Sequence, residues 1–312
     1  MFRAGCKPWT PAMPDDWRRL LPPAAAAGCG ILVGAAMVAT RFVIDQTEPA
    51  SLALLRYAIG VVCLLPPVLM SSRVRFAARD LLPIALLGIG QFGILIALLN
   101  YGLQFTSSAM GALIFATLPL LTMVLAAGLG QERLTPAKSI GVALTVVGVG
   151  LALGDKLGLH DAGLGGWRGE IAVLGSALCG AVCSVFYRPY LKKYPALQVS
   201  LFAMFASVLF LAVLAGWEGF FAGVPSFTTG GWLAVLFIGA NSGVGYYLWL
   251  WALQHAPATN TAVFLSLSPI TATGLGAALL GEEVTALFVA GLAAVALGIW
   301  LAHRRPGAAI SG

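Results

Sequence analysis

Charged side chains are scarce in this sequence: Asp, Glu, Lys and Arg make up 10% of its 312 residues, whereas 59% are hydrophobic. A soluble domain has about 25% charged and about 45–50% apolar residues. The mean hydropathy is +0.92. Because no water-soluble packing buries this much apolar surface, the composition excludes a soluble enzyme, a disordered chain and a secreted disulfide scaffold. It predicts an integral membrane protein.

Several signatures of other protein classes are missing. Cys179 and Cys183 lie one helical turn apart, but no histidine or carboxylate lies near them in the sequence, so we expect packing residues and no metal site. Residues 1–20 lack the apolar core of a cleavable signal peptide. No phosphate-binding loop is present, which argues against ATP as the energy source. The 18 basic residues are scattered between apolar blocks, which argues against nucleic acid as a partner.

Apolar stretches of about 20 residues, the length that crosses a bilayer, occur ten times. They cover approximately residues 22–44, 48–70, 80–103, 108–129, 136–154, 168–190, 196–217, 229–253, 258–280 and 285–303. Since the connections between them are short, no soluble domain fits. We therefore expect an all-α integral membrane protein with ten transmembrane helices.

The basic residues also predict the orientation. With the N-terminus in the cytoplasm, fourteen Lys and Arg residues fall in inside segments, and only Arg41, Lys156 and Arg168 fall outside. By the positive-inside rule, both termini are predicted to be cytoplasmic.

The sequence repeats itself after 150 residues. Residues 90–152 match residues 240–302 without a gap at 16 of 63 positions, so helices three to five repeat as helices eight to ten. A unit of five helices puts the second copy upside down, which predicts two inverted repeats with a substrate site between them. The predicted boundaries are a cytoplasmic segment (1–20), the first repeat (21–154), a periplasmic linker (155–167), the second repeat (168–303) and a cytoplasmic tail (304–312).

Both repeats carry a similar turn before their last helix. The shared residues are Glu132 and Glu282, Thr135 and Thr285, and the glycine pairs Gly141 with Gly148 and Gly291 with Gly298. This pattern resembles the EamA-type proteins of the drug/metabolite transporter superfamily over about residues 22–303, and in size the chain is similar to bacterial YddG-type amino-acid exporters. The resemblance implies a secondary transporter that exports small metabolites, above all amino acids, including aromatic ones. Export of amphipathic cations or drugs is the alternative.

The repeated glutamates suggest a structural role. Glu132 and Glu282 precede the last helix of each half, where a carboxylate meets free N–H groups and the positive end of the helix dipole. We expect them to cap these helices, with an ion relay as the alternative. No Asp or Glu lies in the middle of a predicted span, and proton-coupled antiporters usually hold an ionisable relay there. Facilitated or exchange-type transport is therefore predicted.

Paired prolines mark one part of the candidate site. Pro119 and Pro269 lie in the middle of equivalent helices, where each removes a backbone hydrogen bond and predicts a kink. In lipid such a kink is tolerated only where it faces protein or water. Thr117 and Ser266 lie beside the prolines; their hydroxyl groups either line a cavity or bond back to backbone carbonyls.

Deep polar and aromatic residues mark the other part. Gln91 and Asn241 are equivalent amides that either join helices or contact substrate. Tyr246 and Tyr247 lie too deep for an interfacial belt, and one of them is expected to face the cavity. Arg56 lies about 12 Å deep in the second helix. It either binds a substrate carboxylate or reaches the surface to pair with Asp45 or Glu48, and we favour the surface pairing.

The sequence also argues against two other classes of membrane protein. A membrane-embedded enzyme needs metal-binding acids, a histidine cluster or an activated nucleophile, and a channel typically shows rings of like charge; the spans contain neither pattern. We therefore predict a carrier that is not an enzyme and that needs no cofactor or metal. Its expected partners are a small-molecule substrate and the lipid bilayer, with the monomer as the functional unit.

Overall fold

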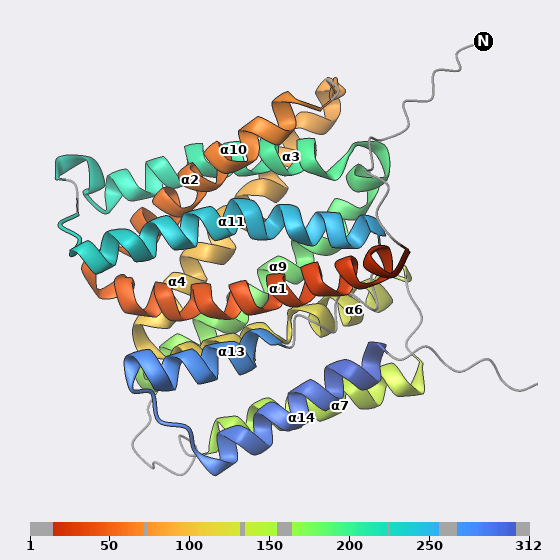
Figure 1. The fold of residues 1–312 in the computed structure, drawn as a ribbon, viewed down its shortest axis with the longest axis vertical. Coiled ribbons are helices and arrows are strands. Elements are labelled where there is room, and N and C mark those ends of the chain that lie inside the picture. Colours follow the sequence, from red (N-terminus) through yellow and green to blue (C-terminus); the bar gives the residue numbers. More distant parts are fainter. Residues whose placement is uncertain are drawn as a thin grey trace, which may run out of the picture.

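The computed structural model describes residues 15–71, 74–131, 135–154, 164–223, 225–255 and 267–303. These residues form helices that run along a common direction, and no β-strand occurs among them (Figure 1). Short 3₁₀ turns lie at Ile44–Gln46, Leu164–Trp167 and Phe220–Ala222.

Ten apolar helical segments make up the described chain, as the sequence predicted. Seven are single helices: α1 (Asp15–Val43), α2 (Pro49–Leu69), α7 (Pro136–Ala152), α9 (Arg168–Lys193), α10 (Ala196–Trp217), α11 (Thr229–His255) and α14 (Ala286–His303). Three are composite: α3 (Ala78–Gly88) with the π-helical turn η2 (Ile89–Ile94) and α4 (Leu95–Phe105), α5 (Ser108–Phe115) with α6 (Leu118–Gly128), and α13 (Leu267–Leu275) with the π-helical turn η6 (Gly276–Leu280).

The segments are long and apolar enough for a multi-pass membrane protein. Six of them reach the length and hydropathy of a membrane span, and three shorter apolar helices, Pro136–Ala152, Leu267–Leu280 and Ala286–Ala302, accompany them. The first helix begins at Asp15, earlier than the predicted residue 22. The predicted start of the ninth helix, residues 258–266, lies outside the described residues.

The fourth span is broken where a kink was predicted. Helix α5 ends at Phe115, four residues before Pro119, and Pro119 lies in the first turn of α6. A proline is tolerated in a first turn because that position makes no intrahelical N–H bond. Pro269 likewise lies near the first described residue of α13.

Left-handed glycines end the fourth and ninth spans. Gly130 has φ of 70° and Gly281 has φ of 65°, a conformation that strains any residue with a Cβ atom. The two glycines are 151 residues apart, one more than the spacing of the repeat. At the spacing of the repeat Gly281 therefore corresponds to Gln131, so the left-handed residue lies one position later in the second half.

The last helices of the two halves pack against each other. Helices α7 and α14 lie side by side at one edge of the molecule (Figure 1). Their backbones meet at glycines: a Cβ atom on Gly141 would lie 2.5 Å from the Gly298 carbonyl oxygen, and one on Gly148 would lie 2.7 Å from the Gly291 oxygen. Helices in lipid associate through such close approach, because the hydrophobic effect does not drive them together.

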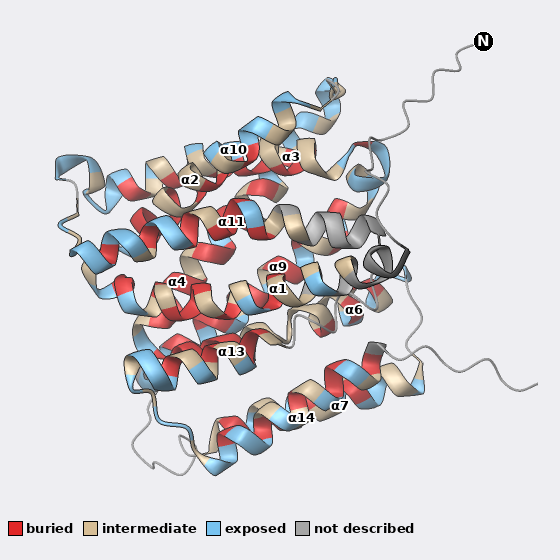
Figure 2. Cartoon of the chain, in the orientation of Figure 1, coloured by how far each residue is buried: buried red, intermediate tan, exposed pale blue. Residues whose placement is uncertain are grey.

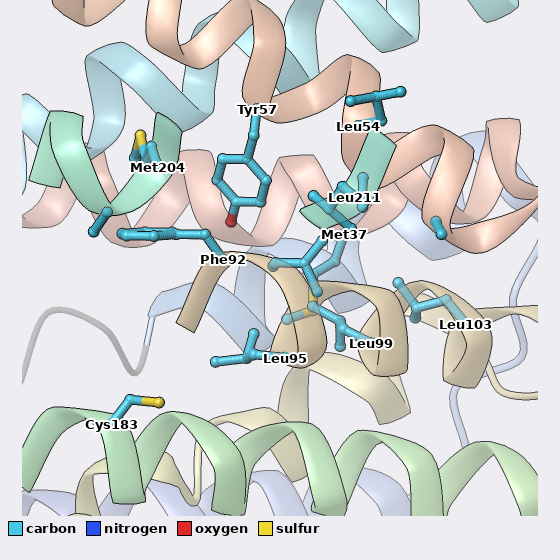
Figure 3. Close-up of a cluster of buried hydrophobic side chains, with 14 of the residues drawn as sticks. Met37, Leu54, Tyr57, Phe92, Leu95, Leu99, Leu103, Cys183, Met204 and Leu211 are labelled. Carbon is cyan, nitrogen blue, oxygen red and sulfur yellow. The ribbon is translucent and has the colours of Figure 1, made fainter. Parts of the chain in front are cut away.

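The largest buried cluster lies between the remaining helices. It includes Leu95, Leu103, Val173, Met204 and Leu211, which come from α4, α9 and α10 (Figures 2 and 3). The outward faces of the helices are exposed and apolar, as Val62 at 68% and Leu69 at 74% exposure illustrate. This inverse of a soluble surface fits a molecule whose outer solvent is hydrocarbon.

The glycine contact between α7 and α14 can be tested by adding a single methyl group. Gly148→Ala places its Cβ against the Gly291 backbone, and overpacking of this kind costs about 1–3 kcal/mol. We expect a lower melting temperature in detergent micelles. Gly150→Ala is the matched control, because nothing lies within 4 Å of a Cβ at Gly150. Equal melting temperatures for the two variants would contradict the contact.

Candidate functional site

Three aromatic rings from three helices meet in the interior. The Phe92 ring on η2 lies 5.3 Å from the Tyr57 ring of α2 and 5.7 Å from the Tyr246 ring of α11, in both cases edge to face. Figure 3 shows Tyr57 pointing from α2 toward Phe92. Such pairs stabilise each other by about 0.5–1.5 kcal/mol beyond burial. Since α11 belongs to the second half, the two halves build this aromatic cluster together.

The two predicted amides each leave an oxygen without a hydrogen-bond donor. Asn241 is 8% exposed, and its Nδ2 donates to the Leu32 carbonyl of α1 at 3.2 Å. Its Oδ1 has no donor among the described residues, and neither has the buried Oε1 of Gln91 on η2. An unsatisfied buried acceptor costs about 1–3 kcal/mol. Asn241 therefore joins two helices through its nitrogen and keeps its oxygen available for a donor.

Arg56 binds a serine of the other half. Its Nε donates to Ser242 Oγ at 2.6 Å, and Ser242 Oγ donates to the Ile238 carbonyl at 2.9 Å. The guanidinium carbon lies 5.8 Å from the centre of the Tyr57 ring, within reach of a cation–π interaction. The favoured pairing of Arg56 with Asp45 or Glu48 is wrong, because Arg56 points to α11 and Asp45 binds Arg41 at 3.0 Å.

The other predicted site residues are less informative. Thr117 Oγ1 donates to the Ile114 carbonyl at 2.7 Å, so this hydroxyl bonds back to its own helix at the break before Pro119. The Tyr247 side chain and the whole of Ser266 lie outside the described residues. Pro269 is buried in α13. Of the predicted residues, Arg56 and Tyr246 belong to the same interior region.

Tyr57, Phe92 and Ser242 were not predicted. Tyr57 follows Arg56 and is as far from the helix ends as Tyr246, so the argument from depth could have identified it. Ser242 follows Asn241 but pairs with a residue 186 positions away, which no local pattern shows. Phe92 is an ordinary residue for a membrane helix and gave no signal.

Two glutamates cap helices of the opposite half. Glu282 accepts hydrogen bonds from Ser108 N at 2.7 Å, Ala109 N at 3.2 Å and Ser108 Oγ at 2.8 Å, so it caps α5. The prediction that Glu282 caps α14 is wrong; Thr285 does so, through Phe288 N at 3.1 Å. Glu132 lies outside the described residues.

Glu218 caps α2 in the same way. It accepts from Ala50 N at 2.9 Å and from Ser51 N at 2.7 Å. Thr106 Oγ1 donates to the buried Glu170 at 3.0 Å, next to the start of α5. Three carboxylates of the second half therefore hold turns and helix starts of the first half, at the end of the molecule where α2 and α5 begin.

The opposite end has its own contacts between the halves. Asp80 of α3 accepts hydrogen bonds from Lys193 and from Tyr194 Oη, the latter at 2.6 Å. Gln198 Nε2 donates to Ser71 Oγ at 2.8 Å. Both ends of the molecule are thus joined by polar contacts that cross from one half to the other.

Two open clefts lie at the end where α2 begins. Their volumes are about 490 Å³ and about 520 Å³, and both are lined by Glu48, Gln104 and Glu218. Neither is lined by the interior residues Arg56 or Asn241. Within the described part of the chain, no three His, Cys, Asp or Glu side chains are placed to hold a metal ion. Cys179 and Cys183 instead pack against Gly90.

Ten apolar helical segments, with an arginine, an amide and aromatic rings between α1, α2, η2 and α11, describe a multi-pass membrane protein with a polar interior. The EamA-like transporter family matches the chain twice, over residues 23–154 and 167–304. The chain therefore belongs to this family of the drug/metabolite transporter superfamily, and it is a transporter and not an enzyme. The two matches also confirm that the sequence consists of two related five-helix units.

Relatives with similar names support this assignment. The chain is 25% identical over 279 residues to an uncharacterized transporter of Archaeoglobus fulgidus, covering 87% of this chain and 95% of the relative. It is 28% identical over 275 residues to a probable terminal-alkyne amino-acid exporter of Streptantibioticus cattleyicolor, covering 86% and 89%. It is 22% identical over 261 residues to a probable amino-acid metabolite efflux pump of Salmonella typhimurium, covering 76% and 85%.

A solved crystal structure shares the fold. It superposes with a TM-score of 0.63 at 20% sequence identity, covering 89% of this chain and 96% of the other. At this identity the likeness shows the fold alone.

The cap across the two halves can be tested at adjacent glutamates. Glu282→Ala leaves the Ser108 and Ala109 N–H groups without their acceptor, and a buried donor left unsatisfied costs about 1–3 kcal/mol. We expect a clear fall in melting temperature in detergent. The exposed neighbour provides the control, since Glu283→Ala should melt like the wild type. Equal melting temperatures for Glu282→Ala and Glu283→Ala would show that the Glu282 cap does not stabilise the contact between the halves.

Proposed function

We propose that this protein exports small metabolites, with amino acids, including aromatic ones, as preferred substrates. In the proposal, the two five-helix units have inverted topology, and the substrate crosses by alternating access between them without ATP. The protein acts as a monomer in a bacterial inner membrane, with both termini in the cytoplasm. Two relatives whose names include amino-acid export or efflux support the choice of substrate.

The single observation that carries the mechanism is the exchange symmetry of the helix contacts. Helix α1 packs against α11 as α9 packs against α4, and α2 packs against α11 as α10 packs against α3 and η2. Helix α2 also packs against its own counterpart α10, α5 against α13, and α7 against α14. Exchanging the two halves converts each contact into another one, as a pseudo-two-fold axis between them requires. In the proposal this axis lies in the membrane plane, because each unit has an odd number of helices.

Individual residues follow the same exchange. Shifting one residue of the Gly141–Gly298 contact forward by 150 positions and the other back gives Gly291–Gly148, which is the second glycine contact. Gln46 and Thr228 form a hydrogen bond at one end of the molecule, and the same shift moves Gln46 to position 196 and Thr228 to position 78. These two positions lie within two residues of the Tyr194–Asp80 hydrogen bond at the other end. Matching links at both ends suit a carrier that opens one end at a time.

The interior supports an amphipathic substrate. The Tyr57, Phe92 and Tyr246 rings provide an aromatic wall, and the Asn241 oxygen is an acceptor without a donor. An ammonium group could donate to such an acceptor while an aromatic side chain packs on the rings. Amphipathic cations would use the same two features, and they remain the alternative substrate class.

Transport should occur in liposomes without an imposed pH gradient. Glu170, Glu218 and Glu282 lie at helix ends, where each accepts a hydrogen bond, and no glutamate of the described residues lies in the middle of a span as a relay would. Purified protein should exchange external labelled phenylalanine for internal unlabelled phenylalanine, with saturation and counterflow. An ohmic current would indicate a channel, and strict dependence on a pH gradient would refute the facilitated mechanism.

The orientation should be visible in maleimide labelling of intact cells. Gly223 and Arg75 are exposed residues in the loops before α11 and α3, at opposite ends of the molecule. Gly223→Cys should react with an impermeant maleimide from outside, whereas Arg75→Cys should react only after the membrane is permeabilised. The unsubstituted chain serves as the background. The reverse pattern would overturn the orientation with cytoplasmic termini.

A further inference from the structure

Arg56 lies on the side of α2 that faces α11. Gly60, one turn further along, is so close to α11 that a Cβ atom there would lie 3.6 Å from the Ser242 Cβ and from the Gly243 nitrogen. The lipid-facing side of α2 is different: it carries Val62 and Leu69, which are 68% and 74% exposed. The Arg56 side chain is thus directed into the protein, although it is only half-buried.

The partner of Arg56 lies on the buried side of α11. Ser242 is 8% exposed and Ile238, one turn before it, is 0% exposed. The opposite side of α11 carries the exposed residues Leu233, Leu236 and Val244. The guanidinium group thus lies between the protein-facing sides of α2 and α11, away from the lipid-exposed Val62 and Val244.

The hydrogen bonds around Arg56 leave two of its nitrogen atoms available. A guanidinium group has five N–H donors, and the Nε donor is used by Ser242. Ser242 in turn donates to Ile238, so its hydroxyl is fixed in orientation. Among the described residues, no carboxylate contacts the Nη1 and Nη2 atoms of Arg56. Burying a charge inside a membrane protein costs free energy unless an acceptor or water contacts it. A bound anion would supply acceptors for Nη1 and Nη2.

We propose that Arg56 binds the carboxylate group of the transported substrate, through Nη1 and Nη2. A guanidinium edge matches a carboxylate with two parallel hydrogen bonds, which fixes orientation as well as charge. Ser242 is a positioning residue that holds the third nitrogen. This inference rests on the proposed transport function and deepens it, because it names the chemical group that the substrate needs.

The surroundings of Arg56 define the rest of the ligand. Tyr57 is its neighbour on α2, and Tyr246 lies one helical turn beyond Ser242 on the same side of α11. The Phe92 ring bridges these two tyrosines. The predicted ligand is therefore a small carboxylate with an apolar or aromatic side chain. An amphipathic cation without a carboxylate would meet the positive charge of Arg56 and be excluded.

The first test uses the wild-type protein and does not depend on any variant folding. Purified protein in detergent is heated with phenylalanine, phenylacetate, phenylalaninamide or phenethylamine, and the melting temperature is measured. The two carboxylates should stabilise the protein at concentrations at least tenfold lower than the amide and the amine. If the amide or the amine stabilises as well as its matched acid, or if neither acid stabilises, the inference is wrong.

The second test removes the guanidinium group. In counterflow competition, Arg56→Gln should weaken phenylalanine binding about ten- to hundredfold, as expected for a lost charged hydrogen bond, and phenylalanine should no longer compete better than its amide. Ser242→Ala should weaken the binding of phenylalanine and phenylacetate less than Arg56→Gln does, and phenylalanine should still compete better than its amide. Arg41→Gln is the control, because Arg41 pairs with Asp45 at the surface and should leave competition unchanged. Wild-type affinity in Arg56→Gln would overturn the proposal.

The two proposals fail differently. If phenylacetate stabilises the wild type and phenylalanine neither stabilises it nor is transported, the amino-acid substrate is wrong and the carboxylate site stands. If phenylalanine is transported and phenylalaninamide competes equally well, the transport function stands and Arg56 is a structural link between α2 and α11.

Discussion

The hydrocarbon core of a membrane offers no hydrogen bonds, and this constraint shapes the whole molecule. Each backbone group that a helix start or break leaves free needs a partner within the protein. Here the partners come from the other half: Glu282 caps α5 and Glu218 caps α2. The same requirement that satisfies helix ends therefore joins the two repeats. Because these links are polar, water would replace them if one end opened as the proposed mechanism requires.

The sequence predicts the ten helices well, because length and hydropathy are local properties. It also predicts that Thr285 and Glu282 lie at a helix start, but the helix that Glu282 caps is 174 residues away and no local rule can identify it. Arg56 illustrates the same limit. Acidic residues near it in sequence suggested a surface pair, whereas folding brought Ser242 beside it. The repeat identified Gln91 and Asn241 as equivalent amides, but it could not show which of their atoms lack a hydrogen-bond partner.

The contacts between the halves are of two chemical kinds. At the ends they are hydrogen bonds, such as Gln46 with Thr228 and Tyr194 with Asp80. Along α7 and α14 they are backbone contacts between glycines, with no polar group to exchange with water. In the proposed alternating-access mechanism, the hydrogen bonds at the ends would break and re-form, whereas the glycine contacts would persist. The interior residues Arg56 and Tyr246 lie on α2 and α11, between the two ends that carry these hydrogen bonds.

The seam between α7 and α14 also sets the order in which the molecule is completed. Helix α7 closes the first repeat, but its most extensive contact is with the last helix of the chain. Until α14 has been synthesised, Gly141 and Gly148 lack their contacts with Gly298 and Gly291, so this face of α7 is uncovered. Assembly of this protein therefore ends with its final helix, and a chain released before residue 286 leaves both repeats incomplete.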